Sequence, residues 1–286
     1  MWKLQVDSGH GMPCPPSQTH GITAPERAVQ PAMKLVVDTD ARTLTVEDGE
    51  SSTHDLYSRS SFEQISRQWV RVGWSLRYYT GFTWMGLPVL QLPDDLVRFQ
   101  EVIWEVRPSL VIETGVFQGG SLLFHASLCK VMGAGRVVGV DIRVPSALRE
   151  AISGHVLGSH ITLIEGDSAS PEVAAEIERL REPGETTLVL LDSDHSRAHV
   201  RRELEAYAPL VTPGSYLIVA DTIMPDLADV PGGKASWAED NPAAALEDFL
   251  TVHPEFECAP RVSQTGVENL PAAVSYWPGG WLRRRP

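Results

Sequence analysis

The chain has 286 residues, of which 43% are hydrophobic, and a formal net charge of −13 at pH 7. No run of residues approaches the roughly 20 apolar residues of a membrane-spanning helix. An acidic chain is also unsuited to nucleic acid, whose phosphates need basic contacts. The three cysteines, Cys14, Cys129 and Cys258, have neither metal-binding nor disulfide spacing. The N-terminus lacks the apolar block of a signal peptide, so we expect a cytoplasmic protein with a small-molecule partner.

The first third of the chain divides into an arm and a cap. Residues 1–32 mix Pro, Gly, Gln and His without periodicity, which is typical of a flexible arm. Residues 33–107 are expected to form an N-terminal hairpin and helical cap. Its predicted elements are strands over 34–40 and 43–49, a helix over 61–79, a proline-containing loop over 80–96, and a helix that Pro108 ends.

Strands and helices alternate over the remaining residues, 108–286. The predicted strands cover 109–114, 136–142, 160–167, 186–194 and 214–222, and the predicted helices cover 121–132, 171–182, 195–211 and 242–250. Such alternation predicts an α/β domain with a doubly wound, mostly parallel sheet covered on both faces. The basic run of Arg283, Arg284 and Arg285 is expected to be a solvated tail.

The stretch VIETGVFQGGS, residues 111–121, leads from a buried strand into a glycine-rich turn. It is not a P-loop, because Ser121 stands where that motif requires Lys. It is not GxGxxG either, because Phe117 replaces the second glycine, which counts against an NAD-linked oxidoreductase. The turn therefore favours a nucleoside ligand without a phosphate. The alternative interpretation is that its glycines only allow tight packing between helix and strand.

Acidic residues follow nearly every predicted strand, which is where functional side chains gather in such sheets. A carboxylate at Asp141 is placed to accept hydrogen bonds from ribose hydroxyls, and Asp167 to accept one from an adenine amino group. Because these carboxylates repel one another, they need donors or a cation nearby. S-adenosylmethionine, with its hydroxyls, amino groups and positive sulfonium, fits this acidic rim better than a pyrophosphate does.

The stretch LLDSDHSRAH, residues 190–199, supplies a second cluster at the end of the fourth predicted strand. Asp192 and Asp194 are hard oxygen ligands of the kind that Mg²⁺ prefers, and Asp221 follows the neighbouring strand. His195 is a candidate base for a substrate hydroxyl. A zinc site is less favoured, because HSRAH lacks the Glu of HExxH. The alternative is that an Asp caps the helix and the histidines are surface residues.

At these residues the sequence resembles the cephalosporin-hydroxylase and rhamnosyl O-methyltransferase family of S-adenosylmethionine-dependent enzymes. The resemblance extends over residues 34–286 and rests on WMGLPVLQLPDDL (84–96), VIETGVFQGGS, VVGVDIR, EGDS, LLDSDHSRAHV, YLIVADT and PGGWLRR. It implies a Rossmann-like class I methyltransferase whose hairpin, following helix and Trp84 loop lie over the cofactor and substrate. It also implies methylation of a sugar hydroxyl, typically on a rhamnose-type deoxysugar of a natural product or glycolipid, whereas the branch named for cephalosporin acts in antibiotic methoxylation.

The resemblance also implies a metal site and a base. Related sugar methyltransferases hold Mg²⁺ with the Asp of a DxxH segment and an acidic pair after the next strand, and the DxxH histidine is their proposed base. These positions correspond to Asp192, His195 and the pair Ala220–Asp221. Ala220 departs from the pattern, because an acid is expected there. Metal binding is therefore expected to be weaker, or Asp194 to compensate.

We therefore predict an S-adenosylmethionine-dependent sugar O-methyltransferase, assisted by Mg²⁺ and forming homo-oligomers. The alternatives are an accessory protein of an antibiotic hydroxylation or methoxylation pathway, which Ala220 keeps open, and an NAD-linked oxidoreductase. The Trp84 loop and residues 231–250 are expected to cover the acceptor. The candidate site residues are Glu113, Thr114, Gly115, Ser121, Asp141, Asp167 and Ser168 for the cofactor, Asp192, Asp194 and Asp221 for the metal, and His195 as the base.

Overall fold

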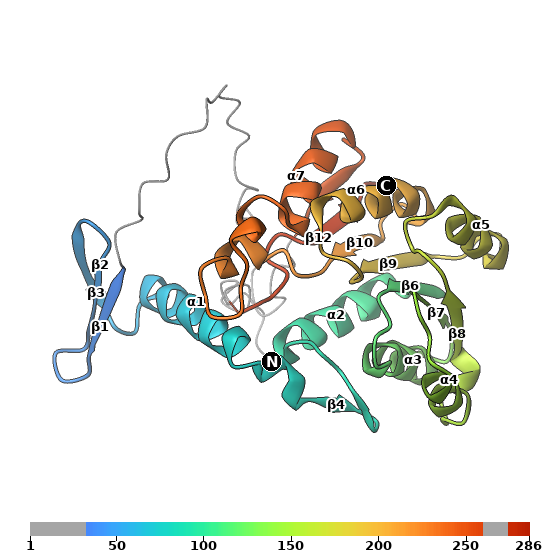
Figure 1. Cartoon of the computed structure of the whole chain (residues 1–286), viewed down its shortest axis with the longest axis horizontal. Helices are drawn as coiled ribbons and strands as arrows, with labels where there is room; N and C mark the ends of the chain where they lie inside the picture. The colour runs from blue at the N-terminus through green and yellow to red at the C-terminus, as the bar shows by residue number, and fades with distance from the viewer. Residues whose placement is uncertain (1–32, 260–273) are drawn as a thin grey trace, which may run out of the picture. The chain divides into compact units, whose positions relative to one another are not determined.

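Residues 33–259 and 274–286 are described by a computed structural model of the chain (Figure 1). They divide into two compact units, one with residues 33–69 and the other with residues 70–259 and 275–286. The predicted arm, residues 1–32, lies outside the described residues. The functional division predicted at residue 107 stays a prediction.

The smaller unit contains an antiparallel sheet of three strands in the order β1–β2–β3, namely β1 Lys34–Asp38, β2 Thr43–Glu47 and β3 Ser51–Asp55. The first two strands form the predicted hairpin, and Arg42 in its turn has a left-handed backbone with φ 57°. The third strand was not predicted, because SSTHD contains no apolar residue to indicate it. Leu44 and Val46 alternate with less buried neighbours along β2, as expected for a strand with one buried face.

The predicted helix over 61–79 is α1, Arg59–Ser75. It ends earlier than predicted, because Arg77 takes a left-handed conformation with φ 57° that a helix does not continue through. A short 3-10 helix, η1, follows at Tyr78–Gly81.

The larger unit is built on a sheet of seven strands in the order β8–β7–β6–β9–β10–β12–β11. Five of these strands are parallel and correspond to predicted strands: β6 Leu110–Thr114, β7 Arg136–Asp141, β8 Ile161–Glu165, β9 Thr187–Leu191 and β10 Tyr216–Val219. Ile112 of β6 pairs with Val138 on one side and Val189 on the other. The predicted α/β class, with a mostly parallel sheet, is confirmed.

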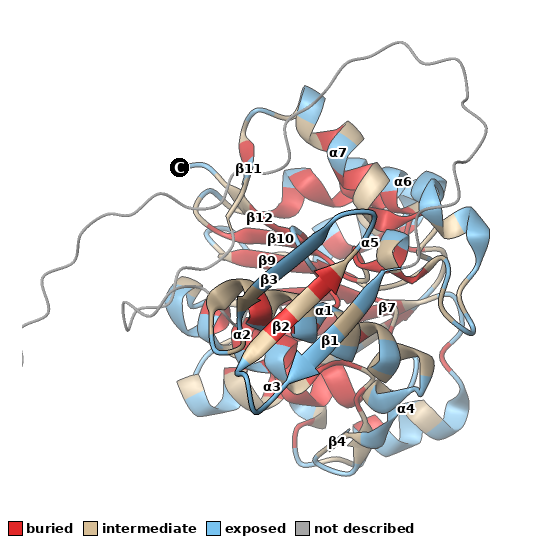
Figure 2. Cartoon of the chain, turned by 90° about the vertical axis from the view of Figure 1, so that its left-hand side faces the viewer, coloured by how far each residue is buried: buried red, intermediate tan, exposed pale blue. Residues whose placement is uncertain are grey.

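Helices cover both faces of this sheet, as Figure 1 shows: α2 Pro93–Val106, α3 Gly120–Met132, α4 Ser146–Ser153, α5 Pro171–Leu180, α6 Arg197–Tyr207 and α7 Pro242–Val252. Leu110 and Ile112 pack in one buried cluster with residues of α5, α6 and α7. Because side chains alternate along a strand, Val111 faces the opposite side, which α2 and α3 cover. The central strands β6, β9 and β10 are therefore buried on both faces, and the helices are buried mainly on their inner sides (Figure 2).

Helix α7 is held at its first turn and along its apolar face. Its apolar residues Ala245, Leu246 and Phe249 are buried in the cluster with the sheet. Asn241 caps its first turn by accepting a hydrogen bond from Ala244 N at 2.9 Å. The apolar face of α7 is therefore occupied within its own chain.

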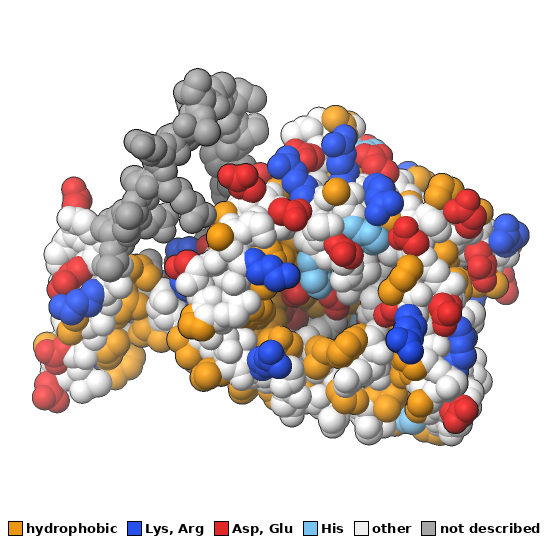
Figure 3. Space-filling view, in the orientation of Figure 1, with side chains coloured by type: hydrophobic (Ala, Val, Ile, Leu, Met, Phe, Trp, Pro, Cys, Tyr) orange, Lys and Arg blue, Asp and Glu red, His pale blue; other side chains and the backbone are white. Residues whose placement is uncertain are grey.

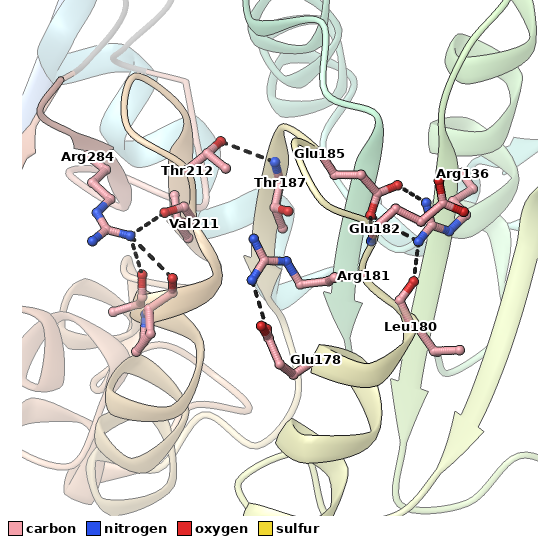
Figure 4. Close-up of polar contacts among 12 residues, drawn as sticks. Arg136, Glu178, Leu180, Arg181, Glu182, Glu185, Thr187, Val211, Thr212 and Arg284 are labelled. Atoms are coloured by element: carbon pink, nitrogen blue, oxygen red, sulfur yellow. Dashed lines mark hydrogen bonds and ion pairs between the residues drawn. The ribbon is translucent and has the colours of Figure 1, made fainter.

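The last described strand corrects the prediction of a solvated basic tail. β12, Trp281–Arg284, lies between β10 and β11 Phe256–Cys258 and runs antiparallel to both. The Arg284 guanidinium donates to the carbonyl oxygens of Val211, at 2.5 Å, and Pro209, at 3.3 Å (Figure 4). Apolar residues of β12, such as the fully buried Leu282, draw this segment into the sheet despite its charges.

The segment between α1 and α2 covers residues 76–92 and not 80–96 as predicted. Helix α2 begins at Pro93, before the predicted start, because proline suits the first helical position and Asp94 and Asp95 suit the first turn. Two short strands precede it, β4 Thr83–Trp84 and β5 Leu87–Pro88. Among the described residues, no helix combines the length and apolarity needed to cross a bilayer.

Candidate active site

A cleft of about 970 Å³ lies at the carboxyl ends of the parallel strands and is lined by residues from the ends of β6, β7, β8, β9 and β10. This is the edge at which α/β sheets of this kind bind ligands. Figure 3 shows a hollow on this face, with acidic side chains inside it and histidines beside it. The predicted residues Gly115, Ser121, Asp141, Asp167, Ser168, Asp192, Asp194, His195 and Asp221 all line the cleft.

The glycine turn after β6 packs directly against the end of β9. Gly115 has φ 85°, and a Cβ at this position would lie 1.9 Å from the carbonyl oxygen of Asp192. A Cβ at Gly120 would lie 2.1 Å from the carbonyl oxygen of Pro88. Both glycines are therefore required by backbone contact, as the packing interpretation proposed. The same turn also forms part of the cleft wall, so packing and ligand binding do not exclude each other.

Asp141 fixes the outer part of this turn. Its carboxylate accepts hydrogen bonds from Phe117 N at 2.9 Å and from Arg143 N at 3.0 Å. Phe117 has φ 45°, a conformation that an L-residue rarely adopts without such support. A carboxylate has about four lone-pair sites, so Asp141 keeps acceptor capacity for a ligand in the cleft.

Glu113 and Thr114 lie beneath the cleft rather than in its wall. Glu113 is fully buried, accepts a hydrogen bond from Ser121 Oγ, and has its Oε2 3.2 Å from His125 Nε2. Thr114 Oγ1 accepts from Asp192 N at 3.3 Å. Their described contacts join the start of α3 and the end of β9 to β6.

Asp167 and Ser168 follow β8 at the other end of the cleft. Asp167 accepts a hydrogen bond from Ala169 N at 3.0 Å, and Ser168 Oγ lies 3.2 Å from His199 Nε2. His199 belongs to a buried network that sequence reasoning missed, in which Ser193 Oγ donates to Glu203 at 2.7 Å. The hydrogen bond that His199 donates to the Glu203 carboxylate raises the pKa of His199 above its ordinary value. The spacing of His199 and Glu203, four residues apart on α6, was the available signal.

The structure brings Asp192, His195 and Asp221 together from two neighbouring strand ends. One ligand atom from each lies within 4.8 Å of the others, and no further group of this kind was found among the described residues. His195 Nε2 is 3.4 Å from Asp221 Oδ2. Burial raises the pKa of Asp192 well above its usual range, and the charges of Asp221 and Glu113 raise it further. A divalent cation would relieve this repulsion, so the donor set fits Mg²⁺.

Two observations show how the cluster is held. Asp221 has a left-handed backbone with φ 55°, and strain of this kind in a non-glycine residue gathers at functional sites. Gln91, which sequence reasoning missed, donates from Nε2 to Asp192 Oδ2 at 3.2 Å. Gln91 lies in the stretch 84–96 that carries the resemblance, but no role was predicted for it, because it reaches the cluster from the loop before α2.

Asp194 and Ala220, the two residues in question at the metal site, lie outside the three-residue cluster. Asp194 accepts a hydrogen bond from Ser196 N at 2.8 Å, and bonds to Ser196 lower its pKa. Asp194 thus makes the turn that precedes α6, as the capping alternative proposed. Ala220 is buried, and its N–H donates to the carbonyl of Leu191 at 2.9 Å.

The predicted cover is present in part. Trp84 packs edge-on against Phe124, with ring centroids 4.9 Å apart, and donates to Ser127 at 3.2 Å, so its described contacts are with α3. The same loop reaches the cleft through Pro88, Leu90 and Gln91. From the segment 231–250, Trp237 lines the cleft and packs edge-on against Trp74 at 5.4 Å.

The sheet order and the cleft define a Rossmann-like α/β domain with a cleft at the carboxyl edge of its sheet. The chain belongs to the family described as Rhamnosyl O-methyltransferase/CmcI, whose model matches residues 76–285. A rhamnosyl O-methyltransferase of Mycobacterium leprae is 37% identical over 153 residues, which are 51% of this chain and 64% of that protein. One of Mycobacterium tuberculosis (strain H37Rv) is 34% identical over 151 residues, which are 50% of this chain and 58% of that protein.

The matched region spans less than two thirds of the length of these relatives. A solved structure described as the CmcI-N160 apo-structure is 24% identical, with a TM-score of 0.48, and the match covers 72% of this chain and 77% of that chain. The MycE methyltransferase of the mycinamycin pathway, in complex with Mg and SAH, is 24% identical with a TM-score of 0.40 over 53% of this chain and 40% of that chain.

Proposed function

We propose that the protein is an S-adenosylmethionine-dependent O-methyltransferase that acts on a sugar hydroxyl, of the rhamnose type carried by natural products or glycolipids. The observation that carries this proposal is the cluster of Asp192, His195 and Asp221 in one cleft with the glycine turn at Gly115. The sugar acceptor is supported by the names of the relatives that match the chain.

The cofactor end of the cleft suits the nucleoside part of S-adenosylmethionine, which supplies an electrophilic methyl group. We infer that Asp141 accepts hydrogen bonds from the ribose hydroxyls and Asp167 from the adenine amino group. Ser168 and Ser121 are further polar groups of this wall, and Gly115 lets the backbone approach the ligand. Glu113 and Thr114 support the turn from beneath.

The metal end suits Mg²⁺, which we infer to be held by Asp192 and Asp221. Bound there, the ion supplies Lewis acidity that lowers the pKa of a hydroxyl group. Asp194 accepts a hydrogen bond at Oδ1 and lies outside the three-residue cluster, so we propose it only as an additional ligand through its other oxygen.

His195 is the proposed general base. An alcohol is a poor nucleophile at neutral pH, so its proton must leave as the carbon–oxygen bond forms. We infer that His195 accepts this proton at Nε2, and that Asp221 Oδ2, 3.4 Å away, stabilises the imidazolium that results. Replacing His195 by Ala is expected to lower turnover by about 10²–10⁴-fold and to leave S-adenosylhomocysteine binding unchanged. Unchanged turnover would show that the base is another group.

Isothermal titration with S-adenosylhomocysteine, with and without Mg²⁺, tests the proposal as a whole. We expect binding of the nucleoside, binding of Mg²⁺, and loss of the Mg²⁺ signal in Asp192→Asn. The absence of S-adenosylhomocysteine binding by the wild-type protein would contradict the methyltransferase function itself.

One observation favours a second function, a cofactor-binding accessory protein of an antibiotic methoxylation pathway. Ala220 leaves the cluster with two carboxylates where the family pattern has three. The same titration separates the two functions, because an accessory protein would bind S-adenosylhomocysteine but not Mg²⁺.

We also propose that the protein is cytoplasmic and forms homo-oligomers. Exposed apolar residues along α1, such as Phe62, Ile65 and Val72, support a contact between subunits. Light scattering of the purified protein tests the assembly, since a monomeric mass would contradict it. Cell fractionation tests the location, since recovery with membranes would contradict that.

A further inference from the structure

A segment that no predicted motif includes, residues 275–277, supplies two aromatic side chains to the cleft, Tyr276 and Trp277. Its backbone is fixed on two sides. Tyr276 N donates to Asp95 Oδ2 at 2.9 Å, and the Tyr276 carbonyl accepts from Ile223 N at 3.2 Å. Ile223 follows Asp221 by two residues, so Tyr276 is tied to the turn that carries a proposed metal ligand.

The carboxylate of Asp95 accepts hydrogen bonds from both Ser275 and Tyr276. Asp95 lies in the first turn of α2, is 1% exposed, and accepts the bond from Ser275 Oγ at 2.5 Å. Ser275 Oγ in turn accepts from Trp277 N at 2.8 Å. One buried carboxylate therefore sets the backbone from which both aromatic side chains enter the cleft wall.

The hydroxyl of Tyr276 has no hydrogen-bond partner among the described residues, although the side chain is only 4% exposed. Buried phenol hydroxyls nearly always have a partner, and because Tyr276 lines the cleft, a bound ligand can supply it. Burial raises the pKa of Tyr276, so the hydroxyl keeps its proton and can donate. Its ring lies edge-on to Tyr79, with centroids 5.9 Å apart, and is thereby held in place.

We propose that Tyr276 is an acceptor-binding residue, whose hydroxyl donates a hydrogen bond to an oxygen of a deoxyhexose, and that Asp95 is the residue that positions it. The inference rests on the proposed function and names the protein group that recognises the acceptor. Tyr79, which also lines the cleft, adds aromatic surface on which the apolar face and the methyl group of such a sugar can pack.

The chain contains a matched control in Tyr207 of α6. Tyr207 is also buried, and its hydroxyl also lacks a hydrogen-bond partner among the described residues. Unlike Tyr276, it is not among the residues that line the cleft. Tyr207→Phe therefore removes the same atom from the same kind of environment without touching the site.

The experiment uses the full chain with Mg²⁺ and titrates S-adenosylhomocysteine first and methyl α-L-rhamnopyranoside second. We expect Tyr276→Phe to weaken glycoside binding about tenfold, the loss typical of one hydrogen bond. Binding of S-adenosylhomocysteine is expected to stay unchanged in this variant, and both affinities in Tyr207→Phe. Because the removed hydroxyl has no hydrogen-bond partner among the described residues, the melting temperature of Tyr276→Phe is expected not to fall.

Each other outcome overturns a distinct statement. Equal glycoside affinity in the wild-type protein and Tyr276→Phe overturns the role of Tyr276. A wild-type protein that binds S-adenosylhomocysteine but no glycoside overturns the inference and leaves methyl transfer standing. A wild-type protein that does not bind S-adenosylhomocysteine overturns the proposed function, and the inference with it.

A double-mutant cycle tests the positioning role of Asp95. Asp95→Asn keeps an acceptor for Ser275 but loses the acceptor for Tyr276 N. We expect it to weaken glycoside binding in the wild-type background and to have no further effect in the Tyr276→Phe background. An equal loss in both backgrounds would show that Asp95 acts on the cleft without Tyr276.

Discussion

Two carboxylates differ in their neighbours: Asp95, buried in the first turn of α2, and Asp192, half-buried in the cleft wall. Burial raises the pKa of both, to about 7 for Asp95 and well above its usual range for Asp192. At Asp95, hydrogen bonds from Ser275 and Tyr276 N oppose that rise. At Asp192, the charges of Asp221 and Glu113 add to it, and Gln91 alone opposes it by a side-chain hydrogen bond.

The difference indicates two roles. Asp95 stabilises the fold, whereas Asp192 is arranged to bind a ligand. Asp95 has protein donors for both oxygens, so its bonds fasten one segment to another. Asp192 is set among like charges, an arrangement that costs stability until a cation is present. A buried acid is therefore interpreted by counting its donors, and not by burial alone.

The largest expected effect comes from removing the charge of Asp192. Asp192→Asn is expected to abolish Mg²⁺ binding and to lower methyl transfer by at least about 100-fold, because charge stabilisation by a metal is worth several kcal/mol. The same variant is expected to melt at a higher temperature than the wild-type protein without metal at about pH 8. Calorimetric titration and thermal unfolding measure the two effects.

Adding Mg²⁺ is the control, since it should raise the melting temperature of the wild-type protein only. A melting temperature of Asp192→Asn below that of the metal-free wild type would mean that the charge repulsion is not destabilising.

The next effect concerns the pH dependence of stability at Asp95. Because its pKa rises from 3.8 to about 7 on folding, the folded protein takes up a proton. The stability contributed by protonated Asp95 is fully present below the unfolded pKa and is lost as the pH rises through about 7. Asp95→Asn lacks this titration. From about pH 5 to pH 8, the wild type should lose stability relative to the variant, by an amount of the order of a few kcal/mol.

Denaturant unfolding at both pH values measures this difference. The contribution of Asp95 would be excluded if the free-energy difference between wild type and variant were the same at both.

A smaller effect is expected when one donor of Asp95 is removed. Ser275→Ala deletes a hydrogen bond to the carboxyl group and leaves Trp277 N without its acceptor. We expect a loss of about 1–3 kcal/mol in the free energy of unfolding. This corresponds to a fall of a few degrees in melting temperature. Ser275→Thr, which keeps the hydroxyl, is the control, and an Ala variant as stable as wild type would contradict the role of this bond.

The smallest effect is expected at Gln91. Gln91→Met keeps the shape of the side chain but removes the donor to Asp192 Oδ2. The loss is expected to stay within about 1 kcal/mol, because the Gln91 carbonyl oxygen is itself buried without a partner in the described structure and its removal compensates. Thermal unfolding with and without Mg²⁺ measures this effect. A larger loss in the presence of the metal than in its absence would contradict the explanation.

Sequence reasoning predicted the surroundings of Asp192 far better than those of Asp95. Asp192 and Asp221 end adjacent parallel strands, and a strand pattern alone predicts that such side chains meet. Asp95 was placed in a loop, and Ser275 and Tyr276 are 180 and 181 residues from it in the chain. No local pattern connects residues at that separation.

The strands of the sheet also divide into those that a local sequence pattern predicts and those that depend on distant contacts. Apolar runs such as TLVLL, β9, were predicted because a strand buried on both faces has no polar alternation. The arginines of β12, WLRR, led to the prediction of a solvated tail. The two residues before them, Trp281 and Leu282, are buried and belong to the sheet. Neighbours distant in the chain decide such cases, and they are not visible in a short stretch of sequence.

The position of β12 has a consequence for synthesis of the protein on the ribosome. β12 lies between β10 and β11 in the sheet, although it follows both in the chain. Until residues 281–284 have been translated and have left the exit tunnel, the edge of β10 has no partner strand on that side. An unpaired apolar edge of this kind can associate with other nascent chains. Protection by a chaperone during translation would therefore matter most before β12 has paired with β10.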